Sequence, residues 1–127
     1  MPTLEKFEPR ELGPKPWGQE ILVACTEHYT GKVLLMQRGH RGGLQFHVVK
    51  DETFYLFSGL CRVRFEKEGV LQEATMRPGE SYHVPPGAVH QVEALEDSVL
   101  FEASVPAFND RINVGEQYGQ GAMGDAW

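Results

Sequence analysis

The feature that most constrains this chain is a succession of short apolar or alternating segments separated by turn residues. Segments of this kind, rich in β-branched and aromatic residues, are typical of the strands of a β-sandwich or barrel. Nine of them follow one another, at residues 21–25, 32–37, 44–49, 53–58, 60–66, 70–76, 81–84, 90–95 and 98–104. The sequence therefore predicts an all-β fold with little room for helix.

The connectors between these segments are short and rich in residues that break regular structure. Pro78-Gly79, Pro85-Pro86-Gly87 and Lys67-Glu68-Gly69 are examples, and such residues favour tight turns. Short links join antiparallel neighbours, because a parallel crossover needs about a dozen residues or more. We therefore expect the sheet to be antiparallel.

The predicted strands define one domain with two flanking ends. A chain of 127 residues suits a single domain around one core. We expect residues 1–18 to form an extended N-terminal arm along the barrel wall, because three prolines lie between residues 8 and 18. Residues 19–108 should form the barrel. Residues 109–127 should form a C-terminal tail with a loose, glycine-rich tip.

Charge and hydropathy argue against several kinds of partner. The net charge of −6 disfavours nucleic acid, because phosphate binding needs a lysine and arginine surface. Charged residues occur throughout positions 5–10, so the first ten residues do not contain the apolar segment that a signal peptide requires. The sequence also has no run of about 18 apolar residues, the length that a membrane-spanning helix needs. We expect a cytoplasmic protein with a small-molecule substrate and neither nucleic-acid nor membrane partners.

Four side chains have the chemistry and spacing to hold one metal ion. Gln45 and His47 are two residues apart, so they share one face of a strand. Glu52 follows closely enough for a strand-turn-strand to return its carboxylate beside them. His90 comes directly after the rigid turn Pro85-Pro86-Gly87-Ala88-Val89, which could aim it inward. Imidazole, carboxylate and amide oxygen together suit a divalent ion such as Zn²⁺, Mn²⁺, Fe²⁺, Co²⁺ or Ni²⁺.

The spacing around these residues resembles the two motifs of the cupin superfamily. Gly39 to Gly59 read G-x5-Q-x-H-x4-E-x6-G, which is similar to the first motif with glutamine in place of its first histidine. Gly79 to His90 read G-x5-P-x-G-x2-H, which is similar to the second motif, although Ala94 stands where that motif often has asparagine. The resemblance implies a jelly-roll barrel, or double-stranded β-helix. It also implies a metal held by Gln45, His47, Glu52 and His90.

The flanking residues are similar to the mannose-6-phosphate isomerase branch of the cupins, whose site uses Gln, His, Glu and His. The similar stretches are Lys15-Pro16-Trp17-Gly18, the segment 44–52, Asn109-Asp110-Arg111-Ile112-Asn113 and Tyr118-Gly119. This resemblance implies a metal-dependent sugar or sugar-phosphate isomerase. In that reaction the metal binds a carbonyl and the adjacent hydroxyl, and a base moves a proton through an enediol.

Three further residues are candidates for roles beside the metal. His83 or Lys50 could be the general base, which must reach the proton and have a pKa near the working pH. Arg41 and Lys50 could bind a phosphate or another anion on the substrate. Each also has a plainer interpretation: His83 could face either side of its strand, and Arg41 and Lys50 could be solvated surface residues.

Two other functions remain open at this stage. Two histidines and a glutamate are enough for a non-haem metal dioxygenase. A small barrel could also bind a sugar without turning it over, as a sensor or accessory protein. Whatever the function, we expect a homodimer, because small cupins generally pair through their strands and an exposed sheet edge is a liability unless it is covered.

Overall fold

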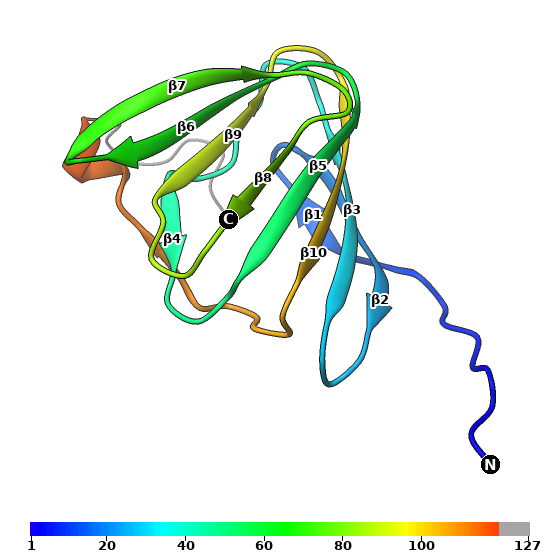
Figure 1. Ribbon diagram of the computed structural model, residues 1–127. Coiled ribbons are helices and arrows are strands. Elements are labelled where there is room, and N and C mark those ends of the chain that lie inside the picture. The colour runs from blue at the N-terminus through cyan, green and yellow to red at the C-terminus, as the bar shows by residue number, and fades with distance from the viewer. Residues whose placement is uncertain (120–127) are drawn as a thin grey trace.

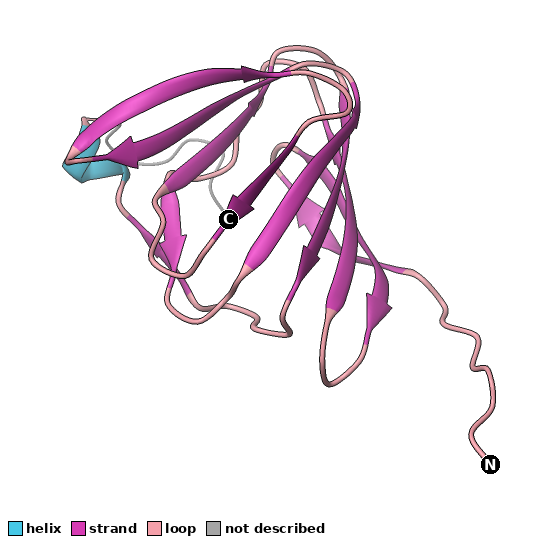
Figure 2. Ribbon diagram, in the orientation of Figure 1, coloured by secondary structure: helices cyan, strands magenta, loops and turns pink. Residues whose placement is uncertain are grey.

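The computed structural model describes residues 1–119, and almost all of its regular structure is β-strand. Its elements are β1 (Arg10–Lys15), β2 (Gly18–Cys25), β3 (Thr30–Met36), β4 (Gln45–His47), β5 (Glu52–Ser58), β6 (Cys61–Lys67), β7 (Val70–Met76), β8 (Ser81–Val84), β9 (His90–Ala94), β10 (Ser98–Ser104), β11 (Arg111–Asn113) and the 3-10 helix η1 (Gly115–Tyr118). Figure 2 shows these strands and the short helix. Within residues 1–119, no helix has the length and apolar character needed to span a membrane.

All nine predicted segments form strands, which confirms the all-β prediction. Two strands were missed, β1 in the predicted arm and β11 in the predicted tail. Residues 120–127, which include the predicted loose tip, lie outside the described residues.

The strands form two antiparallel sheets in a jelly-roll arrangement (Figure 1). The larger sheet has the order β1-β2-β3-β10-β5-β8, and the smaller sheet has the order β11-β4-β9-β6-β7. Every pairing between these strands is antiparallel. The antiparallel prediction is therefore confirmed, and both sheets turn one face toward a common interior.

The alternation of side chains along each strand builds the core. On β5, Phe54 and Leu56 are buried while Tyr55 and Phe57 are exposed, as the two-residue period of a strand requires. The core cluster draws on both sheets and is completed by a tryptophan from the β1–β2 turn; its buried members are Trp17, Met36, Phe54, Leu56, Cys61, Val63, Met76, Val84, Ala94 and Leu100. One part of the interior next to this core is polar, and it forms the candidate site.

The predicted N-terminal arm divides into two parts in the structure. Residues 1–9 project away from the sheets (Figure 1), whereas β1 pairs with β2 and extends the larger sheet. Gly18, at the start of β2, has a φ of +146°, and a Cβ there would lie 1.8 Å from the backbone oxygen of Leu35. Only glycine allows β2 and β3 to approach this closely, so the turn that buries Trp17 depends on it.

Candidate metal centre

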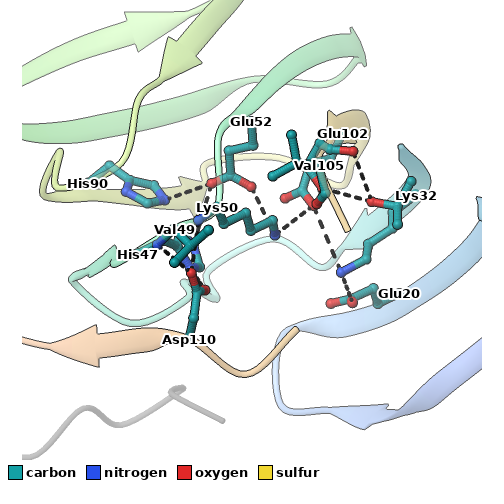
Figure 3. A network of polar contacts seen from close by, with 12 residues as sticks. Glu20, Lys32, His47, Val49, Lys50, Glu52, His90, Glu102, Val105 and Asp110 are labelled. Carbon is teal, nitrogen blue, oxygen red and sulfur yellow. Dashed lines mark hydrogen bonds and ion pairs between the residues drawn. The ribbon is translucent and has the colours of Figure 1, made fainter. Parts of the chain in front are cut away.

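Three of the four predicted ligands converge on one point inside the barrel. His47 ends β4, Glu52 begins β5 and His90 begins β9. The imidazole Nε2 atoms of His47 and His90 lie 3.6 and 3.2 Å from Glu52 Oε1 (Figure 3). Their possible ligand atoms all lie within 4.8 Å of one another, and all three residues are buried. This arrangement could hold a metal ion.

The turn before His90 and the pairing of β4 with β9 bring these segments together. Gln45 pairs with His90 across the two strands. The backbone N–H of Gly87 donates to the carbonyl of His47 at 2.8 Å, so the predicted rigid turn rests against the end of β4. Gln45 is buried, lines the same cavity as the cluster and shares a strand face with His47. Its position is compatible with a fourth ligand.

Both imidazoles are fixed by partners on their other nitrogen. His90 Nδ1 lies 3.0 Å from the carbonyl oxygen of Ala88, and His47 Nδ1 lies 3.0 Å from Asp110 Oδ1. A carbonyl and a carboxylate only accept hydrogen bonds, so each Nδ1 carries a hydrogen, and either ring in its neutral form presents an Nε2 lone pair. This is the usual way in which proteins orient a metal-binding histidine.

The chemistry of the donor set therefore fits a cation. Two Nε2 atoms and a carboxylate oxygen face one another, and a shared positive charge between them, either a proton or a metal ion, holds such a group together. Burial lowers the pKa of the His47 imidazole, despite the opposing effect of Glu52, and this favours the neutral ring that a metal requires. His47, Glu52 and His90 fit a divalent ion.

Asp110 is a functional residue that sequence reasoning missed. Its Oδ1 accepts from His47 at 3.0 Å, and its Oδ2 accepts from the backbone N–H groups of Val49 and Lys50, each at 2.8 Å. Burial would raise the pKa of Asp110, but these hydrogen bonds outweigh it and the pKa is lowered. Asp110 thus stays ionised and anchors both His47 and the turn after β4.

Lys50 is buried at the site rather than solvated. Its Nζ lies 3.1 Å from Glu52 Oε2 and 3.0 Å from Glu102 Oε2. Burial alone would lower the pKa of Lys50, but the two carboxylates outweigh burial and raise it above the ordinary lysine value. Such a lysine remains a cation and is unsuited to the predicted role of general base.

The structure does not bring His83 or Arg41 into the site. His83 pairs with Thr53 across β8 and β5, so it shares the outward face of the sheet, and its exposed Nε2 lies 2.6 Å from Asp51 Oδ1. Arg41, in the β3–β4 connector, forms a backbone bridge with Glu93. Neither residue is among the described residues that line the cavity around Glu52.

The cluster opens into a cavity of about 280 Å³. Part of its wall is apolar and includes Trp17, Leu34, Met36, Phe54 and Leu100. The other part carries charged side chains to which sequence reasoning gave no role, namely Lys15, Glu20, Lys32, Glu102, Asp110 and Arg111. The cavity can therefore hold a small molecule that touches the cluster, a hydrophobic surface and several charged groups at once.

Five charged residues form a row across the larger sheet, one from each of five adjacent strands. In sheet order they are Glu52 (β5), Glu102 (β10), Lys32 (β3), Glu20 (β2) and Lys15 (β1). Lys32 Nζ lies 3.9 Å from Glu102 and 3.2 Å from Glu20 (Figure 3). Lys15 Nζ lies 3.8 Å from Glu20. Burial and the neighbouring Glu52 raise the pKa of Glu102 to about 7. This charged row leads from the His47–Glu52–His90 cluster to β1.

Several proteins of known structure, with different names, share the fold of this chain. KdgF from Halomonas sp. is 25% identical, with a TM-score of 0.67 over 80% of this chain and 89% of that chain. The capsular polysaccharide assembling protein CapF from Staphylococcus aureus is 18% identical, with a TM-score of 0.73 over 86% of this chain. Oxalate decarboxylase from Bacillus subtilis, which has Mn(II) centres, is 16% identical, with a TM-score of 0.67 over 84% of this chain.

The length of these relatives differs from that of this chain. The chain covers 32% of the CapF structure and 30% of the oxalate decarboxylase structure. Because both are less than 25% identical to this chain, they show likeness of fold alone. No curated protein matches the sequence. A model of the cupin domain matches residues 32–105, more than half of the chain and the part that contains His47, Glu52 and His90. Together with the two-sheet jelly roll, this match shows that the chain belongs to the cupin family.

Proposed function

We propose that this protein binds one divalent metal ion through Gln45, His47, Glu52 and His90 and isomerises a small sugar or sugar derivative. The observation that carries the proposal is the convergence of two oriented imidazoles and a carboxylate at the wall of a monosaccharide-sized cavity. A divalent ion bound there would supply Lewis acidity to a carbonyl and an adjacent hydroxyl oxygen.

The proposed reaction is an aldose–ketose exchange that needs no oxidant. The carbon-bound proton at C2 is removed and returned at C1, while the hydroxyl proton moves from the C2 oxygen to the C1 oxygen. Asp110 and the Ala88 carbonyl orient His47 and His90. Lys50 helps to keep Glu52 ionised, because its ammonium lies 3.1 Å from that carboxylate.

We assign the proton transfer to Glu102. It lines the cavity, and its carboxylate lies beside Lys50, 3.0 Å from the Nζ atom, one strand away from the metal cluster. A general base must lie within hydrogen-bond reach of the proton that it removes, and Glu102 is a carboxylate of the cavity wall that the metal cluster does not use. This assignment replaces Lys50, which is held as a cation, and His83, which faces outward.

The test begins with metal-loaded protein and a panel of aldoses that includes mannose 6-phosphate. Proton NMR in D₂O detects both the ketose and the exchange of the C2 proton for deuterium, so it reports proton transfer even where little ketose accumulates. We expect exchange with the wild-type protein and none with His90→Ala. Asp51→Asn is the matched control, since Asp51 is exposed and pairs with His83 outside the cavity.

Retention of metal without any exchange across the panel would contradict the isomerase and leave a sugar-binding cupin. Failure of the wild-type protein to bind Mn²⁺, Zn²⁺, Fe²⁺, Co²⁺ or Ni²⁺ would contradict the metal site itself. The two results are separable because metal content is measured on the same samples.

One observation favours a second function, that of a non-haem dioxygenase. His47, Glu52 and His90 supply two imidazoles and one carboxylate, the ligand set of iron oxygenases that keep open positions on the metal. The discriminating measurement is oxygen consumption by the Fe²⁺-loaded protein with a thiol, a diketone or a phenol. Uptake that depends on one of these compounds would favour the oxygenase over the isomerase.

We also propose that two copies pair through the outer face of the larger sheet. Tyr55 lies beside Phe101, and Phe101 lies beside Val33, in the register of β5, β10 and β3. Phe57 on the same face is 70% exposed. A continuous apolar surface of this kind on a single chain is typical of a surface that another protein covers.

A further inference from the structure

The outer face of the larger sheet has no charged residue on four adjacent strands. Each of β2, β3, β10 and β5 contains one charged residue. All four of these residues line the cavity on the inner face; they are Glu20, Lys32, Glu102 and Glu52. An antiparallel sheet that packs one face on the core commonly presents polar side chains on the other. The outer face of these four strands departs from that pattern.

Apolar side chains occupy this outer face instead. In the strand register, one apolar row crosses all four strands, and it consists of Ile21, Val33, Phe101 and Tyr55. The outer face of the smaller sheet is different, because Arg64 forms ion pairs there with Glu73 and Glu93, each at 2.9 Å. A sheet face that meets water resembles the second case, whereas a continuous apolar face is typical of a surface that another protein covers.

The N-terminal arm, residues 1–9, is a second apolar element that the single chain leaves in solvent. Each of its residues is exposed, and the arm extends away from the sheets (Figure 1). Leu4 is 98% exposed and Phe7 is 40% exposed, whereas the ion pair between Lys6 and Glu8 lies within the arm itself. A segment that buries little apolar surface does not offset the entropy lost on ordering. An ordered arm therefore needs a surface on which Leu4 and Phe7 can pack.

The dimensions of the outer face favour a contact between this face and the arm. Four strands of seven residues span an area of about 19 by 23 Å, or roughly 450 Å², whereas stable pairs bury about 800 Å² on each partner. Two such faces therefore need further contact area. The arm begins at β1, the edge strand of the same sheet, where Glu11 lies beside Ile21. Nine extended residues reach about 30 Å, which is enough to cross the face.

We propose that the N-terminal arm of each copy, residues 1–9, packs on the outer face of the partner's larger sheet, so that Leu4 and Phe7 contact the apolar row. The proposal rests on the pairing of two copies through that face, proposed above, and adds the segment that each copy contributes to the interface. A second copy fits this role because one chain carries both the apolar arm and the uncharged face. A two-fold exchange of arms covers both of them in both copies.

The first experiment measures the dimer dissociation constant by sedimentation equilibrium of the full-length protein. A variant with Leu4→Ser and Phe7→Ser should raise the constant by about a hundredfold or more, because two apolar side chains of each copy return to water. The matched control carries Glu5→Ser and Lys6→Ser, two changes at charged residues of the same arm, and should keep about the wild-type constant. Circular dichroism and melting temperature report that each variant is folded.

The second experiment identifies the surface that the arm contacts. Phe7 is replaced by the photo-cross-linking residue p-benzoylphenylalanine, which keeps an aromatic side chain, in a ¹⁵N-labelled chain that is equilibrated with unlabelled wild-type chain. After irradiation, mass spectrometry of the cross-linked peptides shows whether the two joined segments come from one chain or from two. We expect a labelled arm joined to unlabelled peptides from β3, β10 or β5.

The possible results separate this proposal from the pairing on which it rests. A wild-type protein that stays monomeric would contradict the pairing through the outer face, and the exchange of arms with it. A wild-type dimer whose dissociation constant does not change in the variant with Leu4→Ser and Phe7→Ser would overturn the exchange of arms alone. Cross-links from residue 7 that stay within one chain, or that join only the smaller sheet of the partner, would overturn it as well.

Discussion

Replacing Asp110 with asparagine exchanges one carboxylate oxygen for an NH₂ group at the residue that orients His47. Asp110 accepts three hydrogen bonds, from His47 Nδ1 at 3.0 Å and from the backbone N–H groups of Val49 and Lys50 at 2.8 Å. All three partners are donors, and an asparagine has a single acceptor oxygen. One side of the new amide must therefore place a donor against a donor.

Both orientations of that amide weaken the metal site. If its NH₂ group faces His47, the ring must move its hydrogen to Nε2, and the lone pair that would bind the metal is lost. If its NH₂ group faces the backbone, two N–H groups lose their acceptor and the turn after β4 loosens. Loss of such a partner typically lowers metal affinity by about tenfold to a hundredfold, or about 1.4 to 2.7 kcal/mol.

The assay is a competition titration of Zn²⁺ or Mn²⁺ against a chelator, using protein first stripped of metal. Asp51→Asn is the control, because it makes the same chemical change at a carboxylate that contacts His83 outside the cavity. We expect wild-type affinity for the control and the stated loss for Asp110→Asn. If Asp110→Asn binds metal within a factor of two of the wild-type protein, Asp110 does not orient a ligand and the reasoning fails.

Four further predictions test other parts of the structure. Glu102→Gln should lower proton exchange by about a hundredfold or more while metal affinity, measured by the same competition titration, changes little. Gly18→Ala should lower the free energy of unfolding, measured in urea, by about 3 to 5 kcal/mol, because the new Cβ would overlap the backbone oxygen of Leu35 and the positive φ is strained for alanine. Gly39→Ala, where a Cβ meets nothing within 4 Å, adds only the strain of the positive φ and should lower it by about 1 to 2 kcal/mol. Light scattering should give twice the 14.3 kDa chain mass for the wild-type protein and the single mass for Phe57→Lys. Asp110 has a lowered pKa when folded, so its contribution to stability should be present above the unfolded pKa of about 3.9; the stability gap between wild type and Asp110→Asn in urea should shrink below about pH 4.

The strands could be predicted because their signal is local. Alternation in 53–58 and 98–104 is readable within six or seven residues, and the structure places strands at both. The two missed strands lack that signal: β1 has the sequence RELGPK and β11 is only three residues long. Both are strands because their backbones complete the edges of the two sheets, and an edge is a property of the whole fold.

The candidate site divides in the same way. His47 and Glu52 lie five positions apart, and the turn before His90 is visible in the sequence, so their convergence could be expected. Asp110 and His47 are 63 positions apart in the sequence, so no local spacing of residues could predict their contact. From the sequence, Lys50 could be interpreted as a solvated lysine or as a base. Its burial could not be predicted, because it depends on Glu102, a carboxylate from β10 that contacts Lys50 only in the folded protein.

The cost of the charged row bears on why it is there. Taking paired charges out of water costs several kcal/mol per ion, and replacing a buried ion pair with apolar residues of similar size is often neutral or stabilising. The inner face of this sheet nevertheless gives one position on each of five adjacent strands to a lysine or a glutamate, beside neighbours such as Leu34 and Leu100 that line the same cavity with apolar surface. Stability alone would favour more leucine at those positions. We infer that this row of fixed charges, which begins at the His47–Glu52–His90 cluster, orients a polar ligand, because such groups are already in place before the ligand arrives.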